Sequence, residues 1–169
     1  MNIRAEQPAD QQAVYDVVKR AFETAAHRDG NEQDLVNTLR DSDAFVPELS
    51  LVAEQGGKIV GHILFTKVQI GTQQALALAP LSVLPEYQRQ GIGSALISEG
   101  HKRAALLGYS YSVVLGSETY YPRMGYVTAR TWGILPPFDV PDENFMACRL
   151  REDAPEVSGI VRYAAAFGI

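Results

Sequence analysis

The stretch EYQRQGIGSAL (residues 86–96) decides the fold, because it joins two segments of different periodicity. Residues 49–84 before it are rich in apolar and β-branched residues and are broken at two glycine turns, residues 56–57 and 71–72. That pattern predicts a meander of three antiparallel strands. Residues 91–108 after it follow a helical period and end at a glycine. The stretch is therefore expected to be a turn from a strand into a helix.

The elements on both sides of this turn predict an α/β (α+β) fold with a mixed sheet. A short strand around Ile3 and helices over residues 8–22 and 31–40 come before the meander. A buried strand over 109–116 follows the long helix, and because a helical crossover leads to it, it should lie parallel to the strand ending near residue 84. We therefore expect a mostly antiparallel central sheet with one parallel pair, flanked by helices. The remaining expectations are a short helix over 117–126, a proline-rich loop over 134–144, a strand over 145–150 and an apolar end, 157–169, that packs back on the domain.

The composition is that of one globular domain over residues 1–169 with a hydrophobic core. Hydrophobic residues make up 46% and charged residues 21%, and no apolar run approaches the ~18 residues that a membrane span needs. The first ten residues lack an apolar leader segment, so we expect a soluble cytoplasmic protein. The single cysteine, Cys148, cannot form an internal disulfide or a thiolate metal site. A net charge of −5 argues against nucleic-acid binding, because that affinity depends on clustered Lys and Arg.

The glycine pair Gly91 and Gly93 is compatible with three kinds of turn. A dinucleotide-binding turn needs a third glycine or an alanine where Leu96 stands, and a phosphate loop of the ATPase type needs a lysine that is missing here. Two alternatives remain open on these residues alone. One is a plain strand-to-helix turn, and the other is an anion site made by the first amides of the helix. Side-chain donors around such a site would be Gln88, Arg89 and Gln90.

Two motifs in the expected order separate these alternatives. The first fits the signature Q/R-x-x-G-x-G/A, and the second, YYPRMGY (residues 120–126), fits Y-x-x-x-G-F/Y. The residues that meet them are Gln88, Gly91 and Gly93, and then Tyr121, Gly125 and Tyr126. With this order of elements, the chain resembles the GCN5-related N-acetyltransferase (GNAT) superfamily along nearly its whole length. Within that superfamily, the sequence is most similar to the bacterial YhbS-type branch.

The resemblance implies an N-acetyltransferase that uses acetyl-CoA as co-substrate, no metal, and a primary amine as acceptor. In the family, the fourth strand pairs with pantetheine, the following loop and helix start hold the pyrophosphate, and the fourth and fifth strands splay apart. By this resemblance, pantetheine is expected to pair with Leu81, Ser82 and Val83. The pyrophosphate is expected to be bound by Gln88, Arg89, Gln90, Gly91, Ile92, Gly93, Ser94 and Ala95.

The implied reaction is direct attack of the amine on the thioester in a ternary complex. The resemblance gives Tyr121 the role of proton or hydrogen-bond donor to the departing thiolate. A backbone N–H near Val83 could polarise the thioester carbonyl. The alternative for Tyr121 is core packing with a satisfied hydroxyl.

The general base is not assigned by these motifs. Several enzymes of the family carry a glutamate on the fourth strand, whereas QQALALAPLSVL (residues 73–84) has no carboxylate. His62, Glu118 and a relayed water are the open alternatives for a base. Cys148 is expected to be a buried, inert thiol.

Three other side chains receive structural expectations. His101 and Lys102 are expected on the solvated face of the long helix. Trp132 and Phe138 either line an acceptor pocket or cap the core.

Two further questions stay open on the sequence. The chain could bind acyl-CoA without turnover, as a sensor or partner-binding module. The strand over 145–150 and the apolar C-terminal segment could complete a homodimer sheet or close the monomer. No motif in the sequence identifies the amine acceptor, which could be a small molecule or a group on a peptide.

Overall fold

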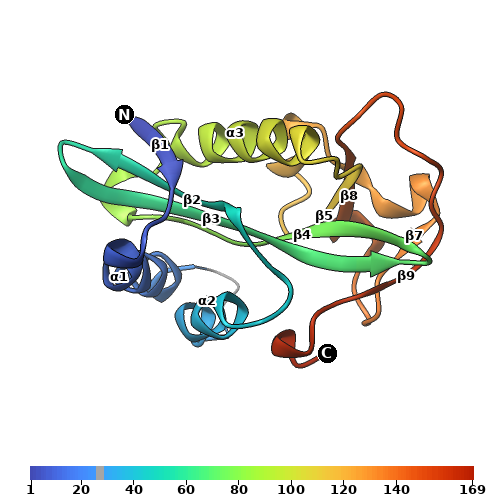
Figure 1. Ribbon diagram of the computed structural model, residues 1–169, viewed down its shortest axis with the longest axis horizontal. Coiled ribbons are helices and arrows are strands. Elements are labelled where there is room, and N and C mark those ends of the chain that lie inside the picture. The colour runs from blue at the N-terminus through green and yellow to red at the C-terminus, as the bar shows by residue number, and fades with distance from the viewer. Residues whose placement is uncertain (26–28) are drawn as a thin grey trace.

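The structure, a computed structural model, describes residues 1–25 and 29–169 as a long twisted sheet between two layers of helices (Figure 1). The sheet runs in the strand order β1-β2-β3-β4-β5-β8-β6. Its strands are β1 (Asn2–Ala5), β2 (Phe45–Gln55), β3 (Lys58–Ile70), β4 (Gln73–Val83), β5 (Tyr111–Leu115), β8 (Phe145–Arg149) and β6 (Val127–Thr128). The three helices are α1 (Gln11–Glu23), α2 (Glu32–Arg40) and α3 (Ile92–Leu106).

The helices cover the two faces of the sheet unequally. Helix α3 lies on one face, and α1 and α2 lie together on the other (Figure 1). Apolar residues at helical spacing account for this arrangement. Val14 and Val18 of α1 and Val36 and Leu39 of α2 form one buried cluster with the sheet. The apolar positions of α3, with Leu96 fully buried among them, belong to a second cluster on the opposite face.

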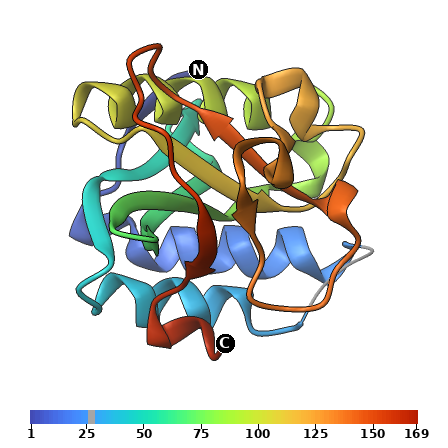
Figure 2. The same ribbon diagram turned by 90° about the vertical axis from the view of Figure 1, so that its right-hand side faces the viewer.

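The predicted class, the mixed sheet and the one parallel pair are confirmed. Each predicted helix is present, and the meander β2-β3-β4 is antiparallel throughout. The C-terminal segment packs back on the domain and reaches α2 (Figure 2). Three short strands were not predicted. They are β6, β7 (Ile134–Leu135) in the expected proline-rich loop, and β9 (Gly159–Arg162), which pairs in parallel with β7 and antiparallel with the end of β3.

The parallel strands β4 and β5 meet only briefly. Their register pairs are Leu76 with Ser112 and Ala77 with Val113. Beyond Ala77, β4 continues to Val83 with β3 on one side and, within the described chain, no paired strand on the other. The strands therefore diverge, and one backbone edge of β4 over residues 78–83 stays open to a ligand.

A bulge lies at the start of this open edge. Phe65 of β3 pairs with Leu78, whereas Ile63 pairs with Leu81, so β4 has one residue more than β3 between these pairs. The extra length falls on Ala79 and Pro80. Proline has no N–H to donate to a ladder, which fits its position at a bulge.

Helix α3 approaches the sheet closely at Gly100, where an added Cβ would lie 2.3 Å from Cε2 of Phe65. We expect Gly100→Val to lower the free energy of unfolding by about 1–3 kcal/mol, because the helix or the ring must move. Urea unfolding measures this loss. Ser98→Val, on the exposed side of the same helix, is the matched control and should stay within about 0.5 kcal/mol of wild type. Equal losses in the two variants would contradict the close packing.

Candidate active site

The open edge of β4 presents its residues alternately to the two faces of the sheet. Leu81 and Val83 are half-buried and pack against the cluster under α3. Ser82, between them, is 1% exposed and points to the face of α1 and α2. The three residues predicted to contact pantetheine thus lie in register on a strand edge with free backbone groups. An extended amide-bearing ligand can add to such an edge as a strand does.

The loop after β4 turns directly into the N-terminus of α3. Gly91 precedes the helix with φ +84°, and Arg89 also has a positive φ, +63°. The first amides of a helix have no intrahelical acceptor, and no side chain caps this helix start. Space beside Gly91 is open, because an added Cβ would meet nothing within 4 Å. The helix dipole and uncapped N–H groups favour an anion at this place.

The two glutamines of the loop use their side chains internally. Gln88 donates from Nε2 to the carbonyl of Val83 at 3.0 Å, and Gln90 donates to the carbonyl of Glu86 at 3.5 Å. These bonds hold the loop to the end of β4. The backbone amides and the exposed guanidinium of Arg89, rather than the glutamine side chains, are therefore the groups left to meet a phosphate.

The tyrosine motif lies against the start of α3. Its short 3-10 turn, Tyr121–Met124, ends at Gly125. The Tyr120 hydroxyl is 3.2 Å from Oγ of Ser94 and occupies the space that a Cβ on Gly93 would fill. The structure therefore brings the two motifs together, although about 30 residues of chain separate them.

Tyr121 is fixed by packing and has a free hydroxyl. Its ring rests on the backbone at Gly116, where an added Cβ would lie 2.5 Å from Cε2, and it contacts the rings of Tyr120 and Tyr126 edge-on. Within the described residues its hydroxyl has no hydrogen-bond partner, and it is not sealed from solvent. Burial raises the pKa of Tyr121, so the phenol keeps its proton at neutral pH. A protonated, unpartnered hydroxyl is suited to donate to a ligand atom.

His101 is not on a solvated face, which corrects the expectation for it. Its Nε2 lies 3.0 Å from the Tyr126 hydroxyl, which also lies 2.8 Å from Oγ of Ser112, and its ring packs near Phe65. Burial lowers the pKa of His101 to about 4. His101 lies one turn from the buried Ile97 and Ala104, so it faces the sheet with them, and Tyr126 supplies the polar partner. Lys102 is exposed, as predicted.

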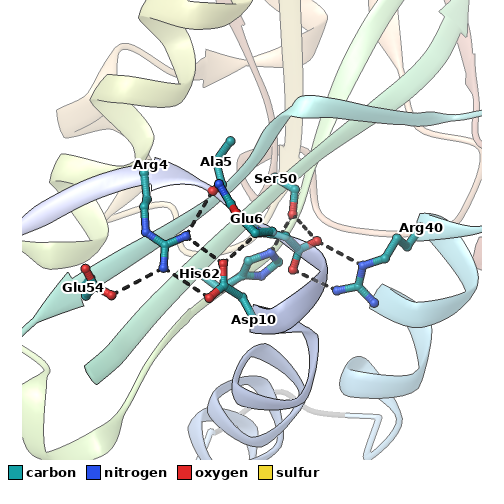
Figure 3. A network of polar contacts seen from close by, with 9 residues as sticks. Arg4, Ala5, Glu6, Asp10, Arg40, Ser50, Glu54 and His62 are labelled. Carbon is teal, nitrogen blue, oxygen red and sulfur yellow. Dashed lines mark hydrogen bonds and ion pairs between the residues drawn. The ribbon is translucent and has the colours of Figure 1, made fainter. Parts of the chain in front are cut away.

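The candidate bases lie in different surroundings. Glu118 is exposed beyond the end of β5 and accepts a hydrogen bond from Asn144 at 2.8 Å. His62 is fully buried on β3, on the face of α1 and α2. It belongs to a polar group that also contains Glu6, Arg40 and Ser50 (Figure 3). Within the described residues, no hydrogen bond joins either of them to Tyr121.

Of the remaining candidates, Cys148 is buried, and Trp132 and Phe138 are half-buried. Cys148 is buried, and burial raises the pKa of its thiol to about 11, as expected for an inert side chain. Trp132 and Phe138 pack against the cluster on the face opposite α3. Trp132 contacts Tyr111 edge-on, and Phe138 contacts Phe145 in the same way.

Other candidate sites in the described chain are weaker. An open groove of about 750 Å³ lies between α1 and the β2–β3 hairpin. Its lining includes Asp10, Asp16, Arg20, Glu54, Lys58 and Leu84. Neither Tyr121 nor residues 78–83 of β4 line this groove, although Leu84, which follows β4, does. Among the described residues, no three His, Cys, Asp or Glu are grouped to hold a metal ion, and no helix has the length and apolarity to cross a membrane.

The residues present fit acetyl-CoA in three independent ways. An unpaired strand edge suits the amides of pantetheine, an uncapped helix start with open space suits the pyrophosphate, and a free hydroxyl suits the sulfur. These features follow one another from β4 to α3 to the tyrosine turn. A strand edge alone or a helix start alone would be far less specific.

A comparison with protein families matches residues 12–126 to the Acetyltransferase (GNAT) family. Among curated proteins, the chain is 41% identical over 130 residues to the uncharacterized N-acetyltransferase YjhQ of Escherichia coli, covering 74% of this chain and 72% of YjhQ. It is 32% identical over 167 residues to the uncharacterized N-acetyltransferase YhbS of the same organism, covering 96% of both chains.

Two solved structures extend this similarity to ligand-bound proteins. The crystal structure of YhbS from Escherichia coli in complex with CoA matches with a TM-score of 0.89 and 28% identity, covering 99% of this chain and 92% of YhbS. A GNAT family acetyltransferase from Brucella melitensis in complex with acetyl-CoA matches with a TM-score of 0.81 and 34% identity, covering 98% of this chain and 97% of that one. The predicted likeness to the YhbS-type branch is confirmed.

Proposed function

The chain belongs to the acetyltransferase (GNAT) family and is an acyl-CoA-dependent N-acyltransferase; from this premise we propose that it transfers an acetyl group from acetyl-CoA to a primary amine. The amine attacks the thioester directly while both substrates are bound. The observation that supports this most is the continuous path from the open edge of β4 through the uncapped start of α3 to the free hydroxyl of Tyr121.

The backbone binds and orients the co-substrate in this proposal. Leu81, Ser82 and Val83 pair with pantetheine along the open edge, and the amides from Gln88 to Ala95 hold the pyrophosphate. A backbone N–H near Val83 donates to the thioester carbonyl, where negative charge develops during attack. Holding both reactants side by side removes the entropic cost of their encounter.

Tyr121 acts on the leaving group. The new C–N bond forms as the C–S bond breaks, and the departing sulfur gains negative charge. The Tyr121 hydroxyl, kept protonated by burial, donates to this sulfur. A proton from the attacking nitrogen replaces any proton that the phenol gives up.

The broader proposal includes a single domain over residues 1–169, a cytoplasmic location and no nucleic-acid partner. The homodimer stays a prediction. β8 and the C-terminal segment, on which it was based, pair and pack within the chain, and the edge strand at that end of the sheet is β6 with the exposed Val127.

A thiol-release assay tests the function. Acetyl-CoA is incubated with the protein and a panel of primary amines, including n-butylamine, putrescine, free lysine and a peptide with a free N-terminus. We expect release of free thiol that depends on one class of amine, with the acetylated amine detected by mass spectrometry. Calorimetry with CoA runs in parallel. CoA binding without turnover of any amine would favour a sensor, and absence of both would refute the proposed site.

A further inference from the structure

Two hydroxyl groups meet where the tyrosine turn touches the first turn of α3. The hydroxyl of Tyr120 and Oγ of Ser94 lie 3.2 Å apart, and either atom could be the donor of the hydrogen bond between them. Both side chains are half-buried, and within the described residues neither hydroxyl has a second hydrogen-bond partner. Two hydroxyls carry two protons, and the bond between them uses only one. One proton is therefore left to donate.

This spare proton lies beside backbone amides that also lack acceptors. The N–H of Ala95 donates to the carbonyl of Gly91 at 3.0 Å, whereas the amides of residues 92–94 have no acceptor within the described chain. Ser94 carries one of these amides and one of the two hydroxyls, so an anion held by its amide is within reach of its side chain. Donors on neighbouring residues that share no acceptor favour an anion there.

The ring of Tyr120 has a fixed place in this arrangement. The ring of Tyr121 contacts it edge-on at a centroid distance of 5.1 Å, and the guanidinium carbon of Arg123 lies 5.1 Å from its centroid. Arg123 is exposed and forms no ion pair within the described residues, so no carboxylate neutralises its charge beside the two hydroxyls. The hydroxyl of Tyr120 is thereby held against Gly93 of α3.

The chemistry of the two hydroxyls sets the direction of their hydrogen bond. A phenol is a better donor and a poorer acceptor than an alcohol, because its oxygen shares a lone pair with the ring. Tyr120 therefore donates to Oγ of Ser94, and the proton of Ser94 is the one left for a ligand. Without such a partner, the hydroxyl of a helical serine turns back to a carbonyl three or four residues earlier. The bond from Tyr120 thus keeps the Ser94 hydroxyl available to a ligand.

We propose that Tyr120 is a positioning residue for CoA: its hydroxyl orients that of Ser94, which donates to the pyrophosphate. This inference deepens the proposed function and rests on it, because it takes the pyrophosphate to be held at the start of α3. The tyrosine motif then has two tasks in neighbouring residues. Tyr120 serves the binding of the co-substrate, and Tyr121 serves the departure of its sulfur.

Calorimetric titration with CoA tests the proposal on Tyr120→Phe, Ser94→Ala and the double variant. Ser94→Ala should raise the dissociation constant about 10–150-fold, as expected for the loss of one charge-assisted hydrogen bond. Tyr120→Phe keeps the ring and should raise it about 3–10-fold, as expected for the loss of one neutral, orienting hydrogen bond. The double variant should match Ser94→Ala within about twofold, because both changes act on the same contact with the phosphate.

Dephospho-CoA shows which phosphate is involved, because it keeps the pyrophosphate and lacks the 3′-phosphate. Each variant should lose the same factor in affinity with dephospho-CoA as with CoA. Ser98→Ala, one turn further along α3 on its exposed side, is the control for Ser94→Ala. Tyr15→Phe is the control for Tyr120→Phe, because the Tyr15 hydroxyl bonds to Asp34 at 3.2 Å on the other face of the sheet (Figure 1). Both controls should bind the two ligands as wild type does.

Steady-state kinetics separate this role from a structural one. Tyr120→Phe should raise KM for acetyl-CoA and leave kcat unchanged, because the lost contact is made to a part of the co-substrate that does not react. A change at Tyr121, the proposed donor to the sulfur, should lower kcat instead. If Tyr120 only supported the turn, its variant would displace Tyr121 and lower kcat as well.

The binding results decide the proposal without turnover. A dissociation constant of Tyr120→Phe within about twofold of wild type would overturn it, and so would additive losses in the double variant. A loss seen with CoA and absent with dephospho-CoA would assign the hydroxyls to the 3′-phosphate and overturn it too. A protein that binds CoA but acetylates no amine would instead refute the proposed function and leave the binding result for Tyr120 standing.

Discussion

Tyr121→Phe should lower kcat for acetyl transfer by about 10²–10⁴-fold, the range expected for loss of a proton donor in the transition state. The change removes one hydroxyl that has no hydrogen-bond partner among the described residues. The phenylalanine ring keeps its place on the backbone at Gly116 and against its two tyrosine neighbours. Neither the fold nor the affinity for CoA should therefore change. A fall in kcat with KM for acetyl-CoA unchanged is the expected signature.

Tyr111→Phe is the matched control for this variant. Tyr111 is a buried tyrosine on β5, and its hydroxyl donates to the carbonyl of Pro155 at 2.9 Å. Loss of this hydrogen bond should lower the free energy of unfolding by about 1 kcal/mol and leave kcat near that of wild type. Equal kcat for Tyr121→Phe and wild type, measured with a good acceptor, would remove Tyr121 from the mechanism.

The parts of this site that sequence patterns predict well are local. The turn from β4 into α3 depends on a glycine at positive φ that is followed at once by a helical pattern of apolar residues. A few consecutive residues are therefore enough to predict it. The parallel placement of β5 follows from the crossover helix between the two strands. The likeness of residues 121–126 to a family motif then predicts that Tyr121 belongs to the same site.

The parts that were missed depend on contacts between distant segments. β9 is a four-residue strand that forms by pairing with the end of β3 and with the two residues of β7. His101 stands on the flank of α3, and only the fold shows that Tyr126 meets it there. Sequence patterns do not pair residues across such separations.

The environment of His62 is the strongest example. Glu6, Arg40, Ser50 and His62 come from a loop, a helix and two strands, and each is unremarkable in its own window. The sequence identified His62 only as one open alternative for a base. Its contact with Ser50 follows from the assembled network (Figure 3), and its register partner Ser82 follows from the pairing of β3 with β4.

Helix α3 offers a matched pair of glycines that tests the anion site. Gly91 lies just before the helix with φ +84°, and Gly108 lies just after it with φ +94°. A Cβ added at Gly91 would meet nothing within 4 Å, and one added at Gly108 would meet only a guanidinium nitrogen of Arg151, at 4.0 Å. Alanine at either position costs a similar left-handed backbone strain, about 1–2 kcal/mol. Both variants should therefore lose comparable stability.

Only Gly91→Ala should also lose CoA affinity. Its Cβ would stand where the pyrophosphate approaches the first amides of α3, and the backbone there would shift to relieve the strain. Loss of one charge-assisted hydrogen bond, about 1.5–3 kcal/mol, corresponds to a rise in the dissociation constant of about 10–150-fold. Calorimetric titration with CoA measures that change. As an independent measure, a fixed high concentration of CoA should raise the melting temperature of Gly91→Ala less than that of wild type. Gly108→Ala should bind CoA as wild type does, because its end of the helix presents carbonyls rather than amides. Equal affinities for the two variants would mean that the start of α3 does not hold the phosphates.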